Sequence, residues 1–230
     1  MPTDSQIKFL KESFRDLLEM LFVTGQISRQ QRLAFERVIR TPNKLRSLAM
    51  GLFGPDREFA IPAWGKLILL SLRGEGKSRF NLLVWEKTST RRQRRKTTTC
   101  LVGHRFTKSI ETRFRWNLRH LFGLFGVKET YSGFDGAAVN ILEDLRTKIH
   151  QHDFCLFDNR ETTYPSKPNV YIEAGMAFAL RKPFILCHYQ GEAWPADFSN
   201  LIYISYQNDR ELFQKLYASL PFFLSTHVRK

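Results

Sequence analysis

The sequence contains few of the residues that form disulfides, metal sites or membrane spans. Only three of its 230 residues are cysteines, Cys100, Cys155 and Cys187. Each stands among apolar residues and none has metal-ligand spacing, so we expect buried free thiols, no metal and a reducing compartment. No apolar run approaches the ~18 residues of a membrane span, and the N-terminus lacks the pattern of a secretory signal. We therefore expect a cytoplasmic protein with no membrane partner.

Acidic residues are also scarce relative to basic ones. The chain has 36 Lys and Arg against 22 Asp and Glu, a net charge of +14. Most of this excess lies in residues 1–99, which hold 20 basic and 9 acidic residues, a net +11. Such a surface can attract nucleic acid, anionic nucleotides or an acidic membrane surface, or can be solvated with no partner.

The N-terminal part reads as helices followed by a β-hairpin. Apolar residues at helical spacing predict helices over residues 4–23, 28–40 and 44–53. They indicate a small helical bundle, or half of one that a second copy of the chain completes as a homo-oligomer. Residues 66–72 and 80–85 then predict the two strands of a hairpin.

Two basic segments in or after this hairpin resemble functional motifs. Gly76-Lys77-Ser78 resembles the end of a phosphate-binding P-loop, but Ser71 stands where that motif needs glycine and a strand follows instead of a helix. We therefore exclude a P-loop. The run Arg91–Lys96 predicts a linker over 91–97, or alternatively a nucleic-acid contact or localisation signal. The expected division is a regulatory or oligomerisation region over 1–90, this linker, and a domain over 98–230.

The pattern changes from residue 98 onward to alternating strands and helices. The predicted strands cover residues 100–103, 127–131, 154–157, 184–187 and 201–204. The predicted helices cover residues 109–125, 140–150, 169–180 and 209–220, the last capped by Asp209. This alternation predicts an α/β fold with a five-stranded parallel sheet in the flavodoxin-like order 2-1-3-4-5 and a site at the carboxyl ends of the strands.

The segment after the first of these strands is a candidate phosphate site. Gly103 permits close approach of a ligand, and His104 and Arg105 precede a helix N-terminus, with Phe106 beside them. Cationic side chains and free backbone N–H groups suit a phosphate or pyrophosphate. A tight turn with two solvated side chains is the alternative.

Two further strand ends carry candidate nucleotide contacts. Tyr131 and Phe134 follow the second strand and could stack on a base or ribose, although the segment also reads as an ordinary glycine loop. Asp158 follows the third strand and could pair with Arg105 or bind ribose hydroxyls, or simply form a turn. Asn169 begins the next helix and is included in the predicted nucleotide site.

Glu173 is the candidate catalytic residue. In a helix that starts at Asn169, Glu173 shares one small, apolar face with Val170, Ala174 and Ala177. A carboxylate on such a face must be paired or must open into a cleft where its charge does chemistry. The alternative is an acid that stabilises the first turn of the helix.

Residues 98–210 resemble the TIR-like and nucleoside 2-deoxyribosyltransferase-like superfamily, especially predicted nucleotide-binding TIR-like domains of bacterial defence systems. The resemblance is carried by Val102-Gly103-His104, the helix before Asp153-Phe154, Asn169-Val-Tyr-Ile-Glu173-Ala-Gly175 and Lys182-Pro183. It implies that Glu173 is the carboxylate of N-glycosidic bond cleavage, with a nucleotide as ligand and no metal or bound cofactor. The transferases usually have Asp-x-Gly-Thr before the acid, whereas this chain has Pro165-Ser-Lys-Pro168, which counts against a true deoxyribosyltransferase.

These observations lead to one leading hypothesis and two alternatives. The leading one is a nucleotide N-glycosidase that hydrolyses NAD in bacterial defence. The first alternative is a non-catalytic sensor that binds a nucleotide signal in the same cleft. The second is a nucleic-acid-binding protein that works through its basic N-terminal half.

Overall fold

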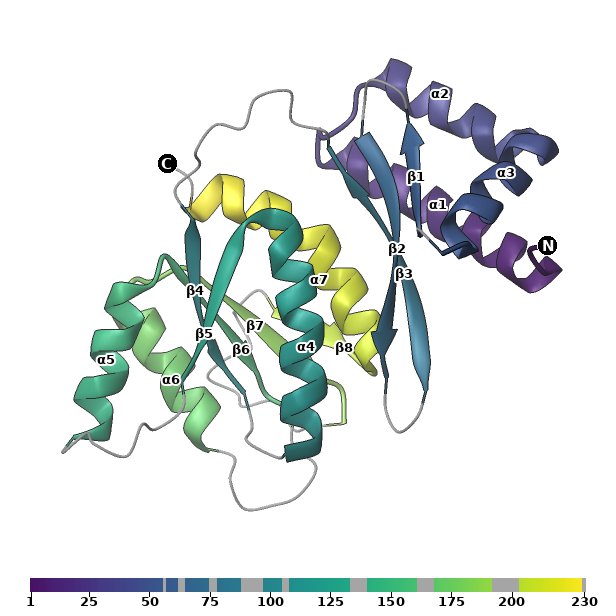
Figure 1. Cartoon of the computed structure of the whole chain (residues 1–230). Helices are drawn as coiled ribbons and strands as arrows, with labels where there is room; N and C mark the ends of the chain where they lie inside the picture. Colours follow the sequence, from purple (N-terminus) through teal and green to yellow (C-terminus); the bar gives the residue numbers. More distant parts are fainter. Residues whose placement is uncertain are drawn as a thin grey trace. The chain divides into compact units, whose positions relative to one another are not determined.

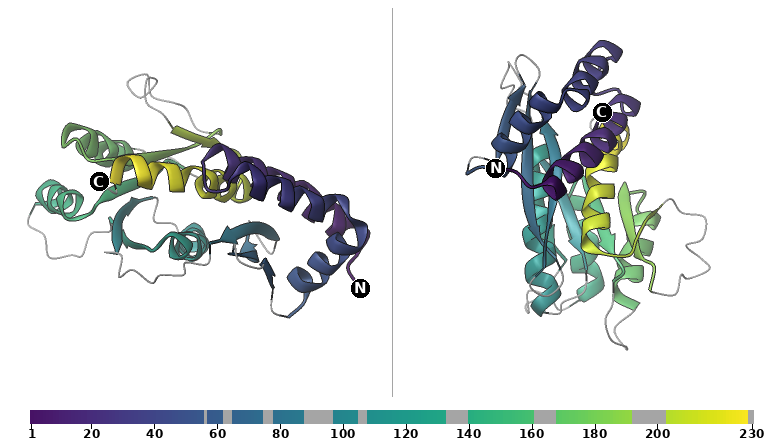
Figure 2. Two further views of the ribbon diagram at one scale, coloured as in Figure 1. Left: turned by 90° about the horizontal axis from the view of Figure 1, so that it is seen from above. Right: turned by 90° about the vertical axis from the view of Figure 1, so that its right-hand side faces the viewer.

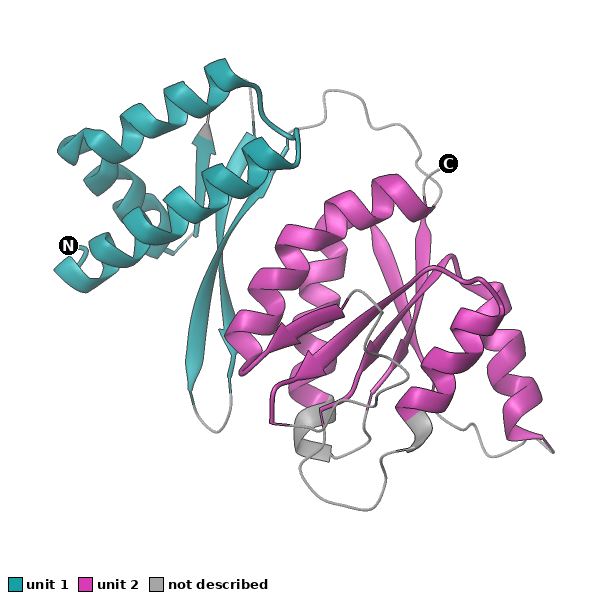
Figure 3. Cartoon of the chain, turned by 180° about the vertical axis from the view of Figure 1, so that it is seen from behind, with its two compact units in different colours: residues 1–95 teal, residues 96–230 magenta. Residues whose placement is uncertain are grey.

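The computed structural model describes residues 1–55, 57–61, 65–74, 78–87, 97–104, 108–132, 140–160, 168–191 and 203–228. Of residues 61, 108–111, 168 and 169 only the backbone is described. The chain forms two compact units, residues 1–95 and residues 96–230 (Figure 3). The linker predicted over 91–97 lies, apart from Thr97, outside the described residues.

The N-terminal unit consists of helices followed by an antiparallel sheet. The helices are α1 (Asp4–Val23), α2 (Arg29–Arg40) and α3 (Pro42–Phe53). The sheet has the order β1-β2-β3, with strands β1 (Glu58–Ile61), β2 (Gly65–Arg73) and β3 (Arg79–Glu86). The predicted helices and hairpin are therefore confirmed. Because β3 begins directly after Ser78, the segment fails the helix requirement of a P-loop, as expected.

Packing within this unit corrects the expectation of a helical bundle. Helix α1 contacts β3, and α3 contacts β1 and β2, so the apolar faces of the helices meet the sheet as well as one another. The buried core includes Leu10, Phe14 and Leu48 from the helices and Leu67 and Val84 from the strands. The strand β1 was not predicted, because Glu58-Phe-Ala-Ile61 is not a continuous apolar run like the short strands that were.

The second unit contains a five-stranded sheet in the order β5-β4-β6-β7-β8, with every neighbouring pair parallel (Figure 1). Its strands are β4 (Thr98–Gly103), β5 (Val127–Tyr131), β6 (Phe154–Asp158), β7 (Phe184–Tyr189) and β8 (Tyr203–Tyr206). Counted along the chain, this is the order 2-1-3-4-5. The predicted flavodoxin-like α/β fold is confirmed.

Helices cover both faces of this sheet, as Figure 1 and Figure 2 show. Helices α5 (Ile141–Gln151) and α6 (Pro168–Ala179) pack on one face, where they bury Leu101, Phe157 and Leu186. Helices α4 (Lys108–Phe125) and α7 (Asp209–Phe223) contact each other on the opposite face. A short π-helical turn, Leu224–Val228, follows α7.

Two finer expectations can be compared with this unit. The three cysteines are free and buried, as predicted. Asp209 was expected to cap α7, but Asn208 is the cap, because its side chain accepts a hydrogen bond from the Glu211 backbone N–H at 3.0 Å. Asp209 is the first helical residue and its side chain is buried against Arg160. Within the described part of the chain, no helix is long and apolar enough to cross a membrane, and no group of residues could hold a metal ion.

Candidate active site

The strand order places a topological switch point at the carboxyl ends of β4 and β6. Helix α4 follows β4 on one face of the sheet, and α6 follows β6 on the other face. The two strands are neighbours, with Gly103 opposite Phe157 in the register. Ligands of open α/β sheets bind in the crevice outside such a point. Gly103 therefore marks the edge where a ligand is expected.

The Glu173 carboxyl group lies at this edge. It comes from the second turn of α6, and the residue is 9 % exposed. The Ser132 hydroxyl, at the end of β5, donates a hydrogen bond to Glu173 Oε1 at 2.9 Å. Val170, Ala174 and Ala177 of the same helix are buried, as the sequence pattern predicted. The carboxyl group thus lies on an apolar helix face and is hydrogen-bonded to the end of β5 through Ser132.

Gly103 provides the space for this carboxyl group. A Cβ atom at position 103 would overlap Glu173 Oε2 and would lie 2.7 Å from Phe157 Cδ1. The glycine was predicted because it would let a phosphate approach the backbone. The structure gives it a different role, since the absent side chain is what allows Glu173 to reach the end of β4.

Burial changes the acidity of Glu173. Burial raises the pKa of Glu173 to about 7, although the hydrogen bond from Ser132 opposes this rise. The second oxygen, Oε2, is buried and has no hydrogen-bond partner among the described residues. A carboxyl group that is partly ionised at neutral pH can serve as an acid, as a base or as a negative charge.

The Ser132 hydrogen bond leads to a first prediction. Because it stabilises the ionised carboxylate, Ser132→Ala should raise the pKa of Glu173 further. The acidic limb of the pH–activity profile should then move to higher pH, by up to about one pH unit for a charge-assisted bond. Initial rates of base release from pH 5 to 9 measure the shift. A Ser132→Ala profile that superimposes on the wild-type profile would mean that Ser132 does not affect the pKa of Glu173.

The raised pKa also predicts how stability depends on pH. Below pH 4.5 the carboxyl group of Glu173 is protonated in both the folded and the unfolded state, so its titration does not lower the free energy of unfolding. Between pH 4.5 and about 7 only the unfolded state ionises, so stability falls by about 3 kcal/mol and then stays constant. Denaturant unfolding of the wild type and Glu173→Gln from pH 4 to 8 isolates this effect. The advantage of the glutamine variant should grow across that window, and a constant difference would mean that Glu173 has an ordinary pKa.

The pleat of the sheet separates the predicted site residues. Successive residues of a strand point to opposite faces, and Gly103 and Ser132 face α6 with Glu173. His104 and Tyr131 face α4 instead, where the His104 ring lies 4.9 Å from that of Phe114. Asp158 also points to this second face. The predicted site residues therefore lie on two faces of the sheet. One group surrounds Glu173 on the α6 face, and the others lie on the α4 face.

The group facing α4 combines a histidine, an arginine and a tyrosine. Arg115 Nε donates a hydrogen bond to His104 Nε2 at 3.3 Å, and its guanidinium lies 4.1 Å from the centre of the Tyr131 ring. The His104 and Tyr131 rings meet edge to face at 5.5 Å. Burial raises the pKa of Tyr131, so its hydroxyl stays protonated. This arrangement brings two predicted nucleotide contacts together around a cation.

Asp158 belongs to a buried polar network. It is 2 % exposed and accepts hydrogen bonds from the Tyr206 hydroxyl and the Arg160 backbone N–H. The Arg160 guanidinium pairs with Asp209 and donates to the Tyr206 hydroxyl at 3.0 Å. Burial raises the pKa of Asp158, and the charge of Arg160 opposes this. These contacts favour a structural role over the predicted ribose contact.

Asn159 anchors the neighbouring strand end. Its amide nitrogen lies 2.8 Å from the Tyr171 hydroxyl and 2.8 Å from His188 Nδ1, and its carbonyl accepts from the Tyr189 N–H at 2.7 Å. It therefore ties β6 to β7 and to α6, the helix that carries Glu173. These hydrogen bonds help to fix the position of α6 along the strand direction.

Several predicted residues cannot be placed. Arg105, Phe106 and Phe134 lie outside the described residues. The predicted ion pair between Arg105 and Asp158 therefore lies outside them as well. Asn169 lies in the first turn of α6, with only its backbone described. Conversely, Ser132 and Arg115 were not singled out. Ser132 follows Tyr131 at a strand end, which was the available signal, whereas Arg115 could be found only by knowing which turn of α4 lies beside β4 and β5.

No family model and no curated protein matches this sequence. Among solved structures, the chain is similar to the CMP N-glycosidase BcmB of Clostridium botulinum, with 21 % identity and a TM-score of 0.39. The match covers 51 % of this chain and 97 % of that one. The likeness is too remote to assign a substrate or residue roles, and the fold assignment above rests on the strand order.

Proposed function

We propose that the second unit is a nucleotide N-glycosidase, with NAD as its leading substrate and Glu173 as its catalytic carboxylate. One observation carries the proposal. Glu173 is a buried carboxyl group at the switch point of the sheet, with one oxygen bound by Ser132 and the other without a partner among the described residues. An unpartnered carboxylate is costly in a folded protein. A function that uses its charge explains why it is there.

The chemistry requires a negative charge beside the anomeric carbon. When the C1′–N bond breaks, its electron pair leaves with the base and the ribose becomes an oxocarbenium-like cation. The ionised Glu173 stabilises this cation by charge, or bonds to C1′ in a covalent intermediate. Water then bonds to C1′ and displaces Glu173 where a covalent bond has formed. Its proton passes to solvent, or to the base where the base leaves as an anion, and the products are the free base and the ribosyl product. The Ser132 hydroxyl holds the carboxyl group in place.

The groups on the other side of the edge suit the rest of a nucleotide. Arg115 supplies a positive charge for phosphate, and Tyr131 and His104 supply rings beside it. Gly103 precedes His104 at this strand end, next to the Glu173 carboxyl group, and carries no side chain of its own. In this proposal the nucleotide crosses the sheet edge, with its phosphates toward α4 and its glycosidic bond toward α6. The nucleotide is substrate, and no further cofactor is part of the mechanism.

A biological setting is proposed from the sequence resemblance alone. A cytoplasmic effector of bacterial defence would use the N-terminal unit to control assembly or to sense a trigger. The nucleotide-sensor alternative retains one supporting observation, since a carboxyl group with a pKa of about 7 and 9 % exposure is only half ionised at neutral pH.

Product analysis tests the proposal. The full chain is incubated at several protein concentrations with NAD, and separately with CMP, UMP, AMP and GMP, and free base is followed by chromatography. Base release that scales with protein supports the glycosidase. A nucleotide that raises the melting temperature without turnover supports the sensor instead. Salt-dependent binding of DNA or RNA with no nucleotide effect supports the nucleic-acid alternative.

A further inference from the structure

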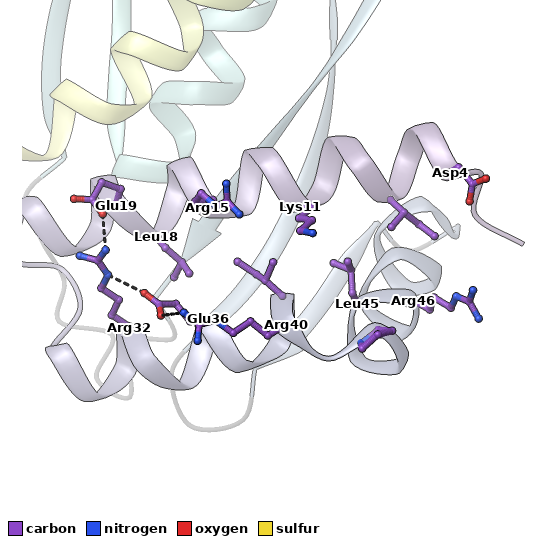
Figure 4. A pocket seen from close by; sticks show the side chains of 13 residues that line it. Asp4, Lys11, Arg15, Leu18, Glu19, Arg32, Glu36, Arg40, Leu45 and Arg46 are labelled. Carbon is purple, nitrogen blue, oxygen red and sulfur yellow. Dashed lines mark hydrogen bonds and ion pairs between the residues drawn. The ribbon is translucent and has the colours of Figure 1, made fainter.

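The N-terminal unit contains a groove of about 800 Å³ between α1 and the pair α2 and α3 (Figure 4). Its apolar lining is aliphatic and consists of Ile7, Leu18, Ile39, Pro42 and Leu45. Of the described residues that line it, none is aromatic. The volume falls within the range of small-molecule sites, roughly 300–1,000 Å³.

Basic side chains surround this groove. Lys11 and Arg15 lie one turn apart on α1, and Arg40 and Arg46 come from the opposite wall. Within the described part of the chain, Lys11, Arg15 and Arg46 have no ion-pair partner. Arg40 contacts Glu36 at 3.4 Å but is 80 % exposed. Cations gathered in a concave site focus a positive potential there.

The acidic residues of the lining are mostly engaged. Arg32 bridges the two walls, with ion pairs to Glu19 at 2.8 Å and to Glu36 at 3.2 Å (Figure 4). Asp4 lies at the far end of the groove. The bridge holds α1 against α2 and does not engage Lys11, Arg15 or Arg46, which stay available to a ligand.

We propose that this groove binds a small phosphorylated ligand with a non-aromatic body. The available cations match two or more phosphate charges, and the aliphatic lining suits a sugar or an aliphatic chain better than a base that needs stacking. The remaining acids of α1, Glu12 and Asp16, are exposed and do not line the groove. A long polyanion lying across α1 would meet these two carboxylates, whereas a compact ligand in the groove would not. A second copy of the chain, itself basic, has the wrong charge.

Calorimetric titration of the full chain at low salt tests this site. The probes are inorganic pyrophosphate and fructose 1,6-bisphosphate, with fructose as the uncharged comparison. The double variant Lys11→Gln/Arg15→Gln should weaken binding of the charged probes at least ~10-fold, the effect of losing charged hydrogen bonds. The matched control, Lys8→Gln/Arg37→Gln, removes the same charge from exposed positions of α1 and α2 outside the groove and should change affinity less than ~2-fold.

Three results would overturn the proposal. The first is no binding of either charged probe at millimolar concentration. The second is an equal effect of both double variants, which would reduce the groove to general positive charge. The third is a DNA duplex that binds through Lys11 and Arg15 and displaces the small probes, because the groove would then be part of a nucleic-acid surface. Melting temperatures of all variants exclude loss of folding as the cause.

Discussion

Glu173→Gln should slow base release by at least ~100-fold, equivalent to about 2.7 kcal/mol of transition-state stabilisation. Glutamine keeps the size and polarity of the side chain and can still contact Ser132, but it cannot carry the negative charge that an oxocarbenium ion requires. Binding of the nucleotide should largely survive, because the groups proposed to hold phosphate and base are unchanged. Turnover and ligand affinity are measured on one preparation.

The stability of the same variant separates catalysis from structure. Above pH 7 the glutamine variant should be at least as stable as the wild type, since a neutral amide is easier to bury than a carboxylate. The matched control is Glu143→Gln, at an exposed position in the first turn of α5, which should leave turnover unchanged. If Glu173 is a structural acid, Glu173→Gln instead unfolds more easily and its activity follows the folded fraction.

Gly103→Ala should have the second largest effect. The new methyl group would occupy the position of Glu173 Oε2 and crowd the Phe157 ring, so both side chains must move. Overpacking of a buried site typically costs ~1–3 kcal/mol. A displacement of the carboxyl group by about 1 Å can cost ~100-fold in rate. We therefore expect a modest loss of stability and a much larger loss of turnover.

Gly175→Ala is the matched control for this substitution. Gly175 lies on α6, two residues after Glu173, and within the described structure a Cβ there would meet nothing within 4 Å. Alanine in a helix is favoured over glycine by up to ~1 kcal/mol, so this variant should be active and no less stable. Wild-type activity in Gly103→Ala would mean that the carboxyl group does not need its observed position.

The strand order could be predicted from the sequence because most of the strands are short apolar runs and a helix lies between each of the first four. The burial of Glu173 could be predicted as well, since Val170, Ala174 and Ala177 mark the helix face that it shares. The Ser132 contact could not, because it depends on the register of β5 against β4. That register places Tyr131 opposite Val102 and so turns Ser132 toward α6.

Other contacts could not be predicted for a similar reason. Asp158 and Asp209 both looked like terminal acids, of a strand and of a helix. Their common partner Arg160 follows β6 in the chain and meets Asp209 only after the sheet has formed. In the N-terminal unit the helical periodicity was clear, but it could not show that a sheet would cover the helices.

A structure of Glu173→Gln with bound nucleotide tests the central claim most directly. The glutamine variant should bind the nucleotide that the wild type hydrolyses and leave it uncleaved. The account predicts that the nucleotide lies across Gly103, with its C1′ atom within about 3.5 Å of the residue-173 side chain, the separation of a near-attack geometry. A nucleotide bound with C1′ far from residue 173, or at an edge of the sheet away from β4 and β6, would contradict it.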